Sequence, residues 1–218
     1  KEASRIQPQT AGVWAFLGDC YRSLNKKDEA VEAYFRAVQS DTTLVAPYFY
    51  LAQVWQQEGK LDSAIYAWRK ISLASPLNPG IYLNLGFLLE LQGKLDEAIA
   101  EYKKVLNLDP KDRQALLSLG RTYEAKREFP QAINFYQEVL TQDSTDIIIR
   151  SKLVQLYFNT GEKEKALDEG LNLYELRPQD KNVKKLLGGI YLSLKKYPQA
   201  ETLFSEYVRM DSTDPSGF

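Results

Sequence analysis

Residues 79–112 read PGIYLNLGFLLELQGKLDEAIAEYKKVLNLDPKD, and the same pattern recurs along the chain every 34 residues. Steps of 34 from Ala98 meet alanine every time, at Ala30, Ala64, Ala132, Ala166 and Ala200. Steps of 34 from Gly86 meet small residues except at Val154, namely Gly18, Ala52, Gly120 and Gly188. Six units of 34 residues tile residues 11–214. A period of roughly 20–50 residues is typical of repeat proteins, so each unit is predicted to be one structural repeat.

Each unit is predicted to form two helices joined by a turn. Asparagine or aspartate at the unit junctions is expected to cap the first helix, at Asn78, Asp112, Asp146, Asp180 and Asp214. Glycines with positive φ are expected where the first helix ends, at Gly59, Gly93 and Gly161. Acidic residues or proline open the second helix, at Asp28, Asp62, Asp96, Pro130, Glu164 and Pro198. Later prolines are expected to stop it, at Pro76, Pro110 and Pro178.

Large aromatic residues recur in the second helix of every unit but the fifth, at Tyr34, Trp68, Tyr102, Tyr136 and Phe204. Small residues in the first helix are expected to let the two helices approach closely, with the aromatic rings filling the space beside them. One unit cannot bury its apolar face alone, so the units are expected to stack. In unit five, Val154 and Gly170 depart from the pattern, which predicts a local change in stacking between units five and six.

The pattern Trp14, Leu17, Gly18 and Tyr21, followed by Ala30, Tyr34 and Ala37, closely resembles the tetratricopeptide repeat consensus. The resemblance implies an all-α fold, a right-handed superhelical solenoid whose concave groove is lined by the first helices. Its six complete repeats would be residues 11–44, 45–78, 79–112, 113–146, 147–180 and 181–214. By the same register, residues 1–10 are expected to end a preceding repeat, and residues 215–218 to begin a further one.

Composition argues against several classes of function. The chain has 28 Lys and Arg residues against 29 Asp and Glu, a net charge of −1, which argues against nucleic acid or an anionic membrane as partner. Histidine is absent, which removes the commonest general base and every histidine-containing zinc site. The single cysteine, Cys20, is expected to be buried like Val54 and Leu88 at the same position of later units. No catalytic residue, cofactor or metal site is predicted, and the compartment, cytoplasm or bacterial cell envelope, stays open.

The resemblance also implies which residues face the groove. They are Phe16, Asp19, Arg22, Phe49, Tyr50, Gln53, Gln56, Leu83, Asn84, Phe87, Glu90, Leu117, Arg121, Glu124, Gln155 and Phe158. An apolar strip through Phe49, Leu83, Phe87 and Leu117, edged by polar residues, has the composition of a binding surface. Asn84 matches a position where the family often uses asparagine to hydrogen-bond the backbone of a ligand. The lysine and asparagine clamp with which co-chaperones of the family hold acidic tails is not matched, since Gly189 stands where asparagine is needed.

A group of lysines makes unit six locally basic, at Lys181, Lys184, Lys185, Lys195 and Lys196. These side chains form either a solvated helix face or a contact with an acidic partner.

The predicted function is a non-enzymatic scaffold that binds a partner helix or extended peptide in the concave groove, within a larger protein or assembly. The alternative is a rigid spacer arm of a multidomain protein or homo-oligomer, with its contacts at the stack ends or the convex face. Self-association is compatible with both, because an exposed solenoid end can stack on a copy of itself. A catalytic domain outside residues 1–218 is a third possibility for which no residue in the sequence argues.

Overall fold

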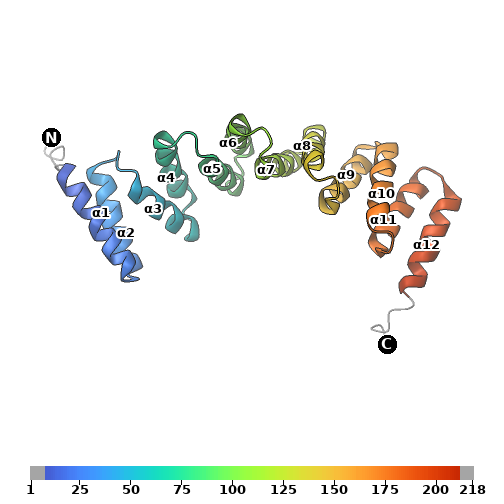
Figure 1. The fold of residues 1–218 in the computed structure, drawn as a ribbon, viewed down its shortest axis with the longest axis horizontal. Coiled ribbons are helices and arrows are strands. Elements are labelled where there is room, and N and C mark those ends of the chain that lie inside the picture. Colours follow the sequence, from blue (N-terminus) through green and yellow to red (C-terminus); the bar gives the residue numbers. More distant parts are fainter. Residues whose placement is uncertain (1–7, 212–218) are drawn as a thin grey trace. The chain divides into compact units, whose positions relative to one another are not determined.

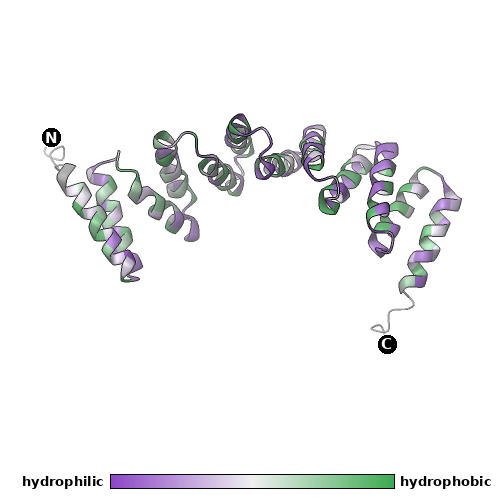
Figure 2. Cartoon of the chain, in the orientation of Figure 1, coloured by the Kyte–Doolittle hydropathy of each residue, from purple (hydrophilic) through white to green (hydrophobic). Residues whose placement is uncertain are grey.

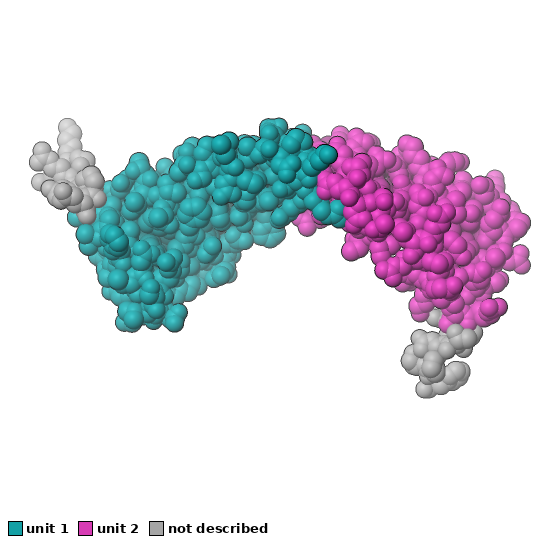
Figure 3. Space-filling view, in the orientation of Figure 1, with its two compact units in different colours: residues 1–115 teal, residues 116–218 magenta. Residues whose placement is uncertain are grey.

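The computed structural model describes residues 8–211, and over this range its secondary structure is α-helical throughout. The chain divides into two compact units, unit 1 (residues 1–115) and unit 2 (residues 116–218), coloured separately in Figure 3. Unit 1 contains the six helices α1 (Pro8–Ser23), α2 (Lys27–Ser40), α3 (Ala46–Gln57), α4 (Leu61–Ala74), α5 (Pro79–Leu91) and α6 (Leu95–Leu108) (Figure 1). Unit 2 contains most of α7 (Arg113–Ala125), then α8 (Phe129–Gln142), α9 (Ile147–Thr160), α10 (Lys163–Leu176), α11 (Lys181–Ser193) and α12 (Tyr197–Asp211).

Consecutive helices pack as pairs, and α1 and α2 lie side by side in Figure 1. The pairs of one unit also contact one another, through α2 and α3 or α4 and α5 in unit 1, and α8 and α9 or α10 and α11 in unit 2. Hydrophobic and hydrophilic residues both occur along the helices (Figure 2), as expected for helices that bury one face. The all-α prediction is therefore confirmed.

The close approach of the two helices in a repeat depends on glycine. A Cβ atom at Gly86 would lie 2.4 Å from Cε1 of Tyr102, far closer than non-bonded carbon atoms approach. Gly120 meets Tyr136 at 2.5 Å in the same way, and Gly188 meets Phe204 at 3.1 Å. The predicted pairing of a small residue in the first helix with an aromatic ring in the second is confirmed.

Side-chain caps begin the first helices where the sequence predicts them. Asn78 accepts a hydrogen bond from the N–H of Gly80, and Asp112 accepts one from the N–H of Ala115. Asp146 and Asp180 each accept from two backbone N–H groups of the following turn. The fifth predicted cap, Asp214, lies outside the described residues.

The turn after each first helix uses the left-handed backbone region. Gly59, Gly93 and Gly161 have φ of 70°, 73° and 83°, as predicted. The equivalent positions of the other three repeats hold non-glycine residues in the same region, Asn25, Arg127 and Lys195, with φ of 56°, 61° and 59°. The period of 34 connects all six positions, so the shape of the turn is kept even where a side chain makes it costly.

Three expectations need correction. Residues 8–10, placed by register at the end of a preceding repeat, form the first turn of α1; residues 1–7 and 215–218 lie outside the described range. Cys20 is exposed, because no helix of the described chain covers this face of α1, whereas its equivalents Val54 and Leu88 are buried. Lys184 is buried, because Glu206 of α12 accepts its hydrogen bond.

Gly170 leaves room that the next repeat occupies. A Cβ atom there would lie 3.2 Å from a methyl group of Leu187 and 3.3 Å from one of Ile190, both in α11. The missing aromatic ring of repeat five is thus replaced by aliphatic side chains of repeat six. The predicted change in stacking between these repeats stays a prediction.

Candidate partner-binding surface

The predicted groove residues lie on the accessible side of their helices. None of the sixteen is buried, although residues one or two positions away, such as Leu51, Ala52 and Leu85, are fully enclosed. Phe49 and Phe87 keep 39% and 41% of their surface exposed. The structure brings these residues together around three hollows, two in unit 1 and one in unit 2.

The α1–α3 hollow has a volume of about 350 Å³. Among the residues that line it are five of the predicted groove residues, Asp19, Arg22, Phe49, Tyr50 and Gln53. The hydroxyl of Tyr34 donates to Oδ1 of Asp19 at 2.6 Å, and Nη2 of Arg22 lies 3.5 Å from the same oxygen. Burial, and then this hydrogen bond, raises the pKa of Tyr34. Asp19 is thus engaged within the protein, and Phe49 and Gln53 are the groups in this hollow that are open to a partner.

The α3–α5 hollow has a volume of about 540 Å³ and is lined by Gln53, Gln56, Gln57, Trp68, Asn84, Phe87 and Leu91. Trp68 is 7% exposed, and its ring meets that of Phe49 edge to face at 6.0 Å. Its Nε1–H has no hydrogen-bond acceptor among the described residues. A buried donor without an acceptor is costly, so this indole marks a place where a bound acceptor would be favourable.

The next repeat shows why Trp68 lacks an acceptor. Tyr102 is the equivalent of Trp68, and its hydroxyl donates to Glu90 Oε2 at 3.0 Å. In repeat two the position of Glu90 is taken by Gln56, to which the indole makes no hydrogen bond. The sequence contains this signal, because the exchange of tyrosine and glutamate for tryptophan and glutamine is visible in the aligned repeats.

Asn84 has a more limited role than the resemblance implies. Its Nδ2 donates to the backbone oxygen of Gly80 at 2.8 Å, within α5. One amide N–H and the Oδ1 oxygen remain available for the backbone of a ligand. Phe16, Leu83, Glu90, Leu117, Arg121 and Glu124 line none of the three hollows.

In unit 2, Glu124 is held by two partners. The hydroxyl of Tyr136 donates to its Oε2 at 2.9 Å, and Nζ of Lys152 lies 3.0 Å from its Oε1. Burial, followed by the hydrogen bond to Glu124, raises the pKa of Tyr136 above its usual value. Glu124 is therefore an acceptor of internal hydrogen bonds, which makes it a poor candidate for holding a partner.

The pKa of Tyr136 gives a test by pH. Because that pKa is raised on folding, its contribution to stability is complete below about pH 10, the usual pKa of tyrosine, and is lost as the pH rises towards the folded value. We expect Tyr136→Phe to lower the free energy of unfolding by about 1.5 kcal/mol at pH 8. Urea denaturation should show this difference from the wild type shrinking above pH 10. The exposed Tyr197→Phe control should change little at either pH, and a pH-independent loss for Tyr136→Phe would contradict the assignment.

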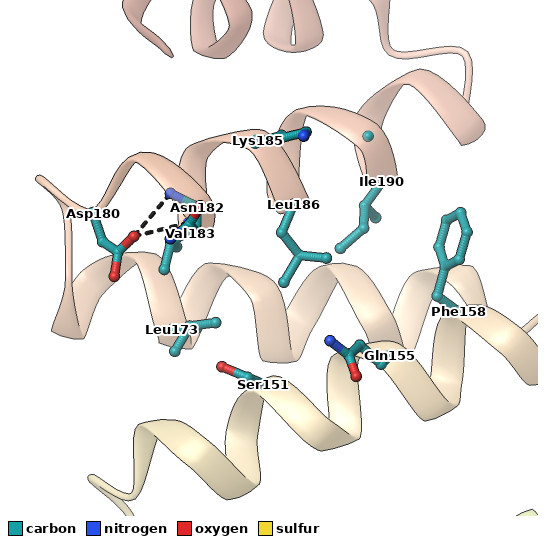
Figure 4. Close-up of a pocket in the computed structure, with 11 residues that line it drawn as sticks. Ser151, Gln155, Phe158, Leu173, Asp180, Asn182, Val183, Lys185, Leu186 and Ile190 are labelled. Carbon is teal, nitrogen blue, oxygen red and sulfur yellow. Dashed lines mark hydrogen bonds between the residues drawn. The ribbon is translucent and has the colours of Figure 1, made fainter. Parts of the chain in front are cut away.

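The α9–α11 hollow has a volume of about 500 Å³ and contains two predicted residues, Gln155 and Phe158 (Figure 4). Sequence reasoning missed most of its lining, including Leu173, Val183, Leu186 and Ile190. The signal was present in the sequence, since Gly170 and Gly189 leave out two side chains in neighbouring helices.

Other kinds of site were also considered over the described residues. Within residues 8–211 no three metal-ligating side chains gather into a cluster that could hold an ion. Over the same range, no helix combines the length and apolar character needed to span a bilayer.

Three sequence models described as tetratricopeptide repeat match the chain, over residues 11–43, 79–144 and 151–215. No curated protein matches the sequence. Among solved structures, a crystal structure of MamA is 22% identical, covers 79% of this chain and 94% of its own, and has a TM-score of 0.66. MamA from Desulfovibrio magneticus RS-1 is 17% identical, with 79% and 97% covered and a TM-score of 0.63. YrrB, described as a protein with an unusual peptide-binding site, is 16% identical, with 84% and 95% covered and a TM-score of 0.63. These likenesses show the fold, an all-α helical-repeat solenoid.

Proposed function

Because the chain belongs to the tetratricopeptide repeat family, a family of protein-interaction scaffolds, we propose that it holds a helix or extended segment of a partner protein along its first helices. The observation that carries the proposal is the exposure of Phe49 and Phe87 beside the two hollows of unit 1. Large aromatic side chains beside hollows are the usual anchors of protein interfaces. YrrB, which shares the fold, is itself described as binding a peptide.

Polar groups around the α3–α5 hollow support a peptide as the ligand. The indole N–H of Trp68 lacks an acceptor, and the amides of Gln53 and Gln56 have no hydrogen-bond partner among the described residues. A peptide backbone supplies one N–H donor and one C=O acceptor at nearly every residue, which suits such a surface. Recognition therefore combines apolar anchors with hydrogen bonds to backbone and needs no catalytic group.

The first experiment is cross-linking mass spectrometry on the native protein in its own extract, which names the partner. Cross-links from another protein to Lys60, Lys94, Lys126 and Lys152 would support the proposal. Cross-links confined to the ends of the repeat array, or to other segments of the same polypeptide, would favour the spacer arm.

Phe87→Ala then tests the site with the partner so identified. We expect at least a tenfold loss of affinity in calorimetry, about 1.4 kcal/mol, because the ring is an anchor in the interface. Thermal stability should change little, because 41% of the side chain is already exposed. The matched control is Phe35→Ala in α2, a second helix, where 43% of the ring is exposed. If Phe35→Ala weakens binding and Phe87→Ala does not, the partner binds the second-helix side instead.

A further inference from the structure

The α9–α11 hollow is the most apolar concave surface described in unit 2. Leu186 and Ile190 project from α11 toward α9, as Figure 4 shows, and Leu173 and Val183 complete the floor. Phe158, 41% exposed, forms one wall. The volume of about 500 Å³ is in the range of pockets that enclose small ligands or side chains.

Gly189 lines this hollow for no reason of internal packing. Its neighbour Gly188 is needed, since a Cβ atom there would lie 3.1 Å from the ring of Phe204. A Cβ atom at Gly189 would meet nothing within 4 Å. Glycine inside a helix costs about 1 kcal/mol relative to alanine, so this position gives up stability without any internal gain. What it does provide is open space above the apolar floor.

The polar groups at the rim define what else would bind. Gln155 and Asn182 have side-chain amides without hydrogen-bond partners among the described residues. Asp180 is occupied, since its Oδ1 accepts the N–H groups of Asn182 and Val183 (Figure 4).

Lys185 is the cation at this rim. Its ammonium has no carboxylate partner among the side chains that the structure describes, and lies 5.9 Å from the centre of the Tyr207 ring. The charge left uncompensated around the hollow is therefore positive. A ligand that complements it carries a negative charge next to an apolar group.

We propose that the α9–α11 hollow binds an acidic segment of a partner protein through one large apolar side chain. The apolar side chain enters the space left by Gly189, a carboxylate beside it pairs with Lys185, and Gln155 and Asn182 bind the backbone. This rests on the proposed scaffold function, but it is a site separate from Phe49 and Phe87. It also assigns a role to the basic character of repeat six.

The test uses the full chain and fluorescein-labelled nine-residue peptides with amidated ends, followed by fluorescence anisotropy at low salt. One peptide has leucine at its centre and glutamates on both sides; a second has alanine at the centre, and a third has lysines in place of the glutamates. We expect the leucine–glutamate peptide to bind at least tenfold more tightly than the other two. Equal affinity for the leucine and alanine peptides, or no binding of any of them, would overturn the proposal.

Two substitutions locate the site. Gly189→Leu fills the hollow without meeting any neighbour, so we expect at least a tenfold loss of peptide affinity with the helix content unchanged. The matched control is Gly12→Leu in α1, where a Cβ atom also meets nothing within 4 Å. Lys185→Glu should exchange the preference for the glutamate peptide for one for the lysine peptide. Unchanged binding by Gly189→Leu would place the peptide elsewhere and refute the assignment.

Failure here is distinguishable from failure of the proposed function. Phe87→Ala should leave binding of these peptides unchanged. If the peptides do not bind but Phe87→Ala still weakens the natural partner, the scaffold function stands and the inference about this hollow falls.

Discussion

Gly86→Val is expected to lower the free energy of unfolding of unit 1 by about 3 kcal/mol, the upper end of the usual cost of overpacking. The first added carbon would lie 2.4 Å from Cε1 and 2.6 Å from Cζ of Tyr102. That ring has little room to move, because Tyr102 is 1% exposed and its hydroxyl donates to Glu90. The helix pair α5 and α6 must therefore separate, which weakens the contacts that both helices make.

Urea denaturation followed by circular dichroism measures this loss, with Gly189→Val as the matched control. Both glycines lie inside first helices, but Gly189 has open space where Gly86 has a ring, so the control should change stability by less than about 0.5 kcal/mol. Adding Tyr102→Leu to Gly86→Val removes the ring atoms that clash, and the two changes should cost less together than the sum of their separate effects. Additive losses would show that Tyr102 is not the source of the strain.

The repeat pattern was enough to predict the fold, because each structural role recurs at a fixed step. The cap at Asp146, the turn at Gly161 and the ring of Tyr102 against Gly86 all follow from the period and ordinary helix chemistry. The period also contained one prediction that the glycines alone do not reveal, the left-handed turn at Arg127. Roles that repeat are therefore predictable even where the residue type changes.

The candidate site was harder to predict because it depends on what differs between repeats. The unpaired indole of Trp68 arises from a change of two residues in different helices, and neither change is unusual alone. Lys184 was grouped with solvated lysines, but it pairs with Glu206, 22 residues away in α12. Pairings of this kind depend on the distance between neighbouring helices and on side-chain rotamers. Neither is visible in the spacing of residues along one chain.

The largest electrostatic loss is expected from Arg150→Met in α9. Arg150 is 9% exposed, and its Nη1 donates to Glu169 of α10 while its Nη2 donates to the backbone oxygen of Ser144 at 2.6 Å. Removing the guanidinium leaves the carboxylate of Glu169, 20% exposed, without its cation, and leaves Ser144 without this donor. Losing one partner of a buried ion pair costs about 3–5 kcal/mol, and we expect about 3 kcal/mol because Glu169 retains some contact with water.

Arg69 and Glu97 provide the matched control, since they also link two helices but are 55% and 51% exposed. Arg69→Met should cost less than about 1 kcal/mol, as exposed ion pairs usually do. The double variant Arg150→Met with Glu169→Met should recover most of the stability, because it removes the unpaired charge together with its former partner. Hydrogen exchange should locate the loss in the single variant to α9 and α10. A loss for Arg150→Met no larger than for Arg69→Met would mean that the buried pair contributes little, and that apolar packing alone holds α9 on α10.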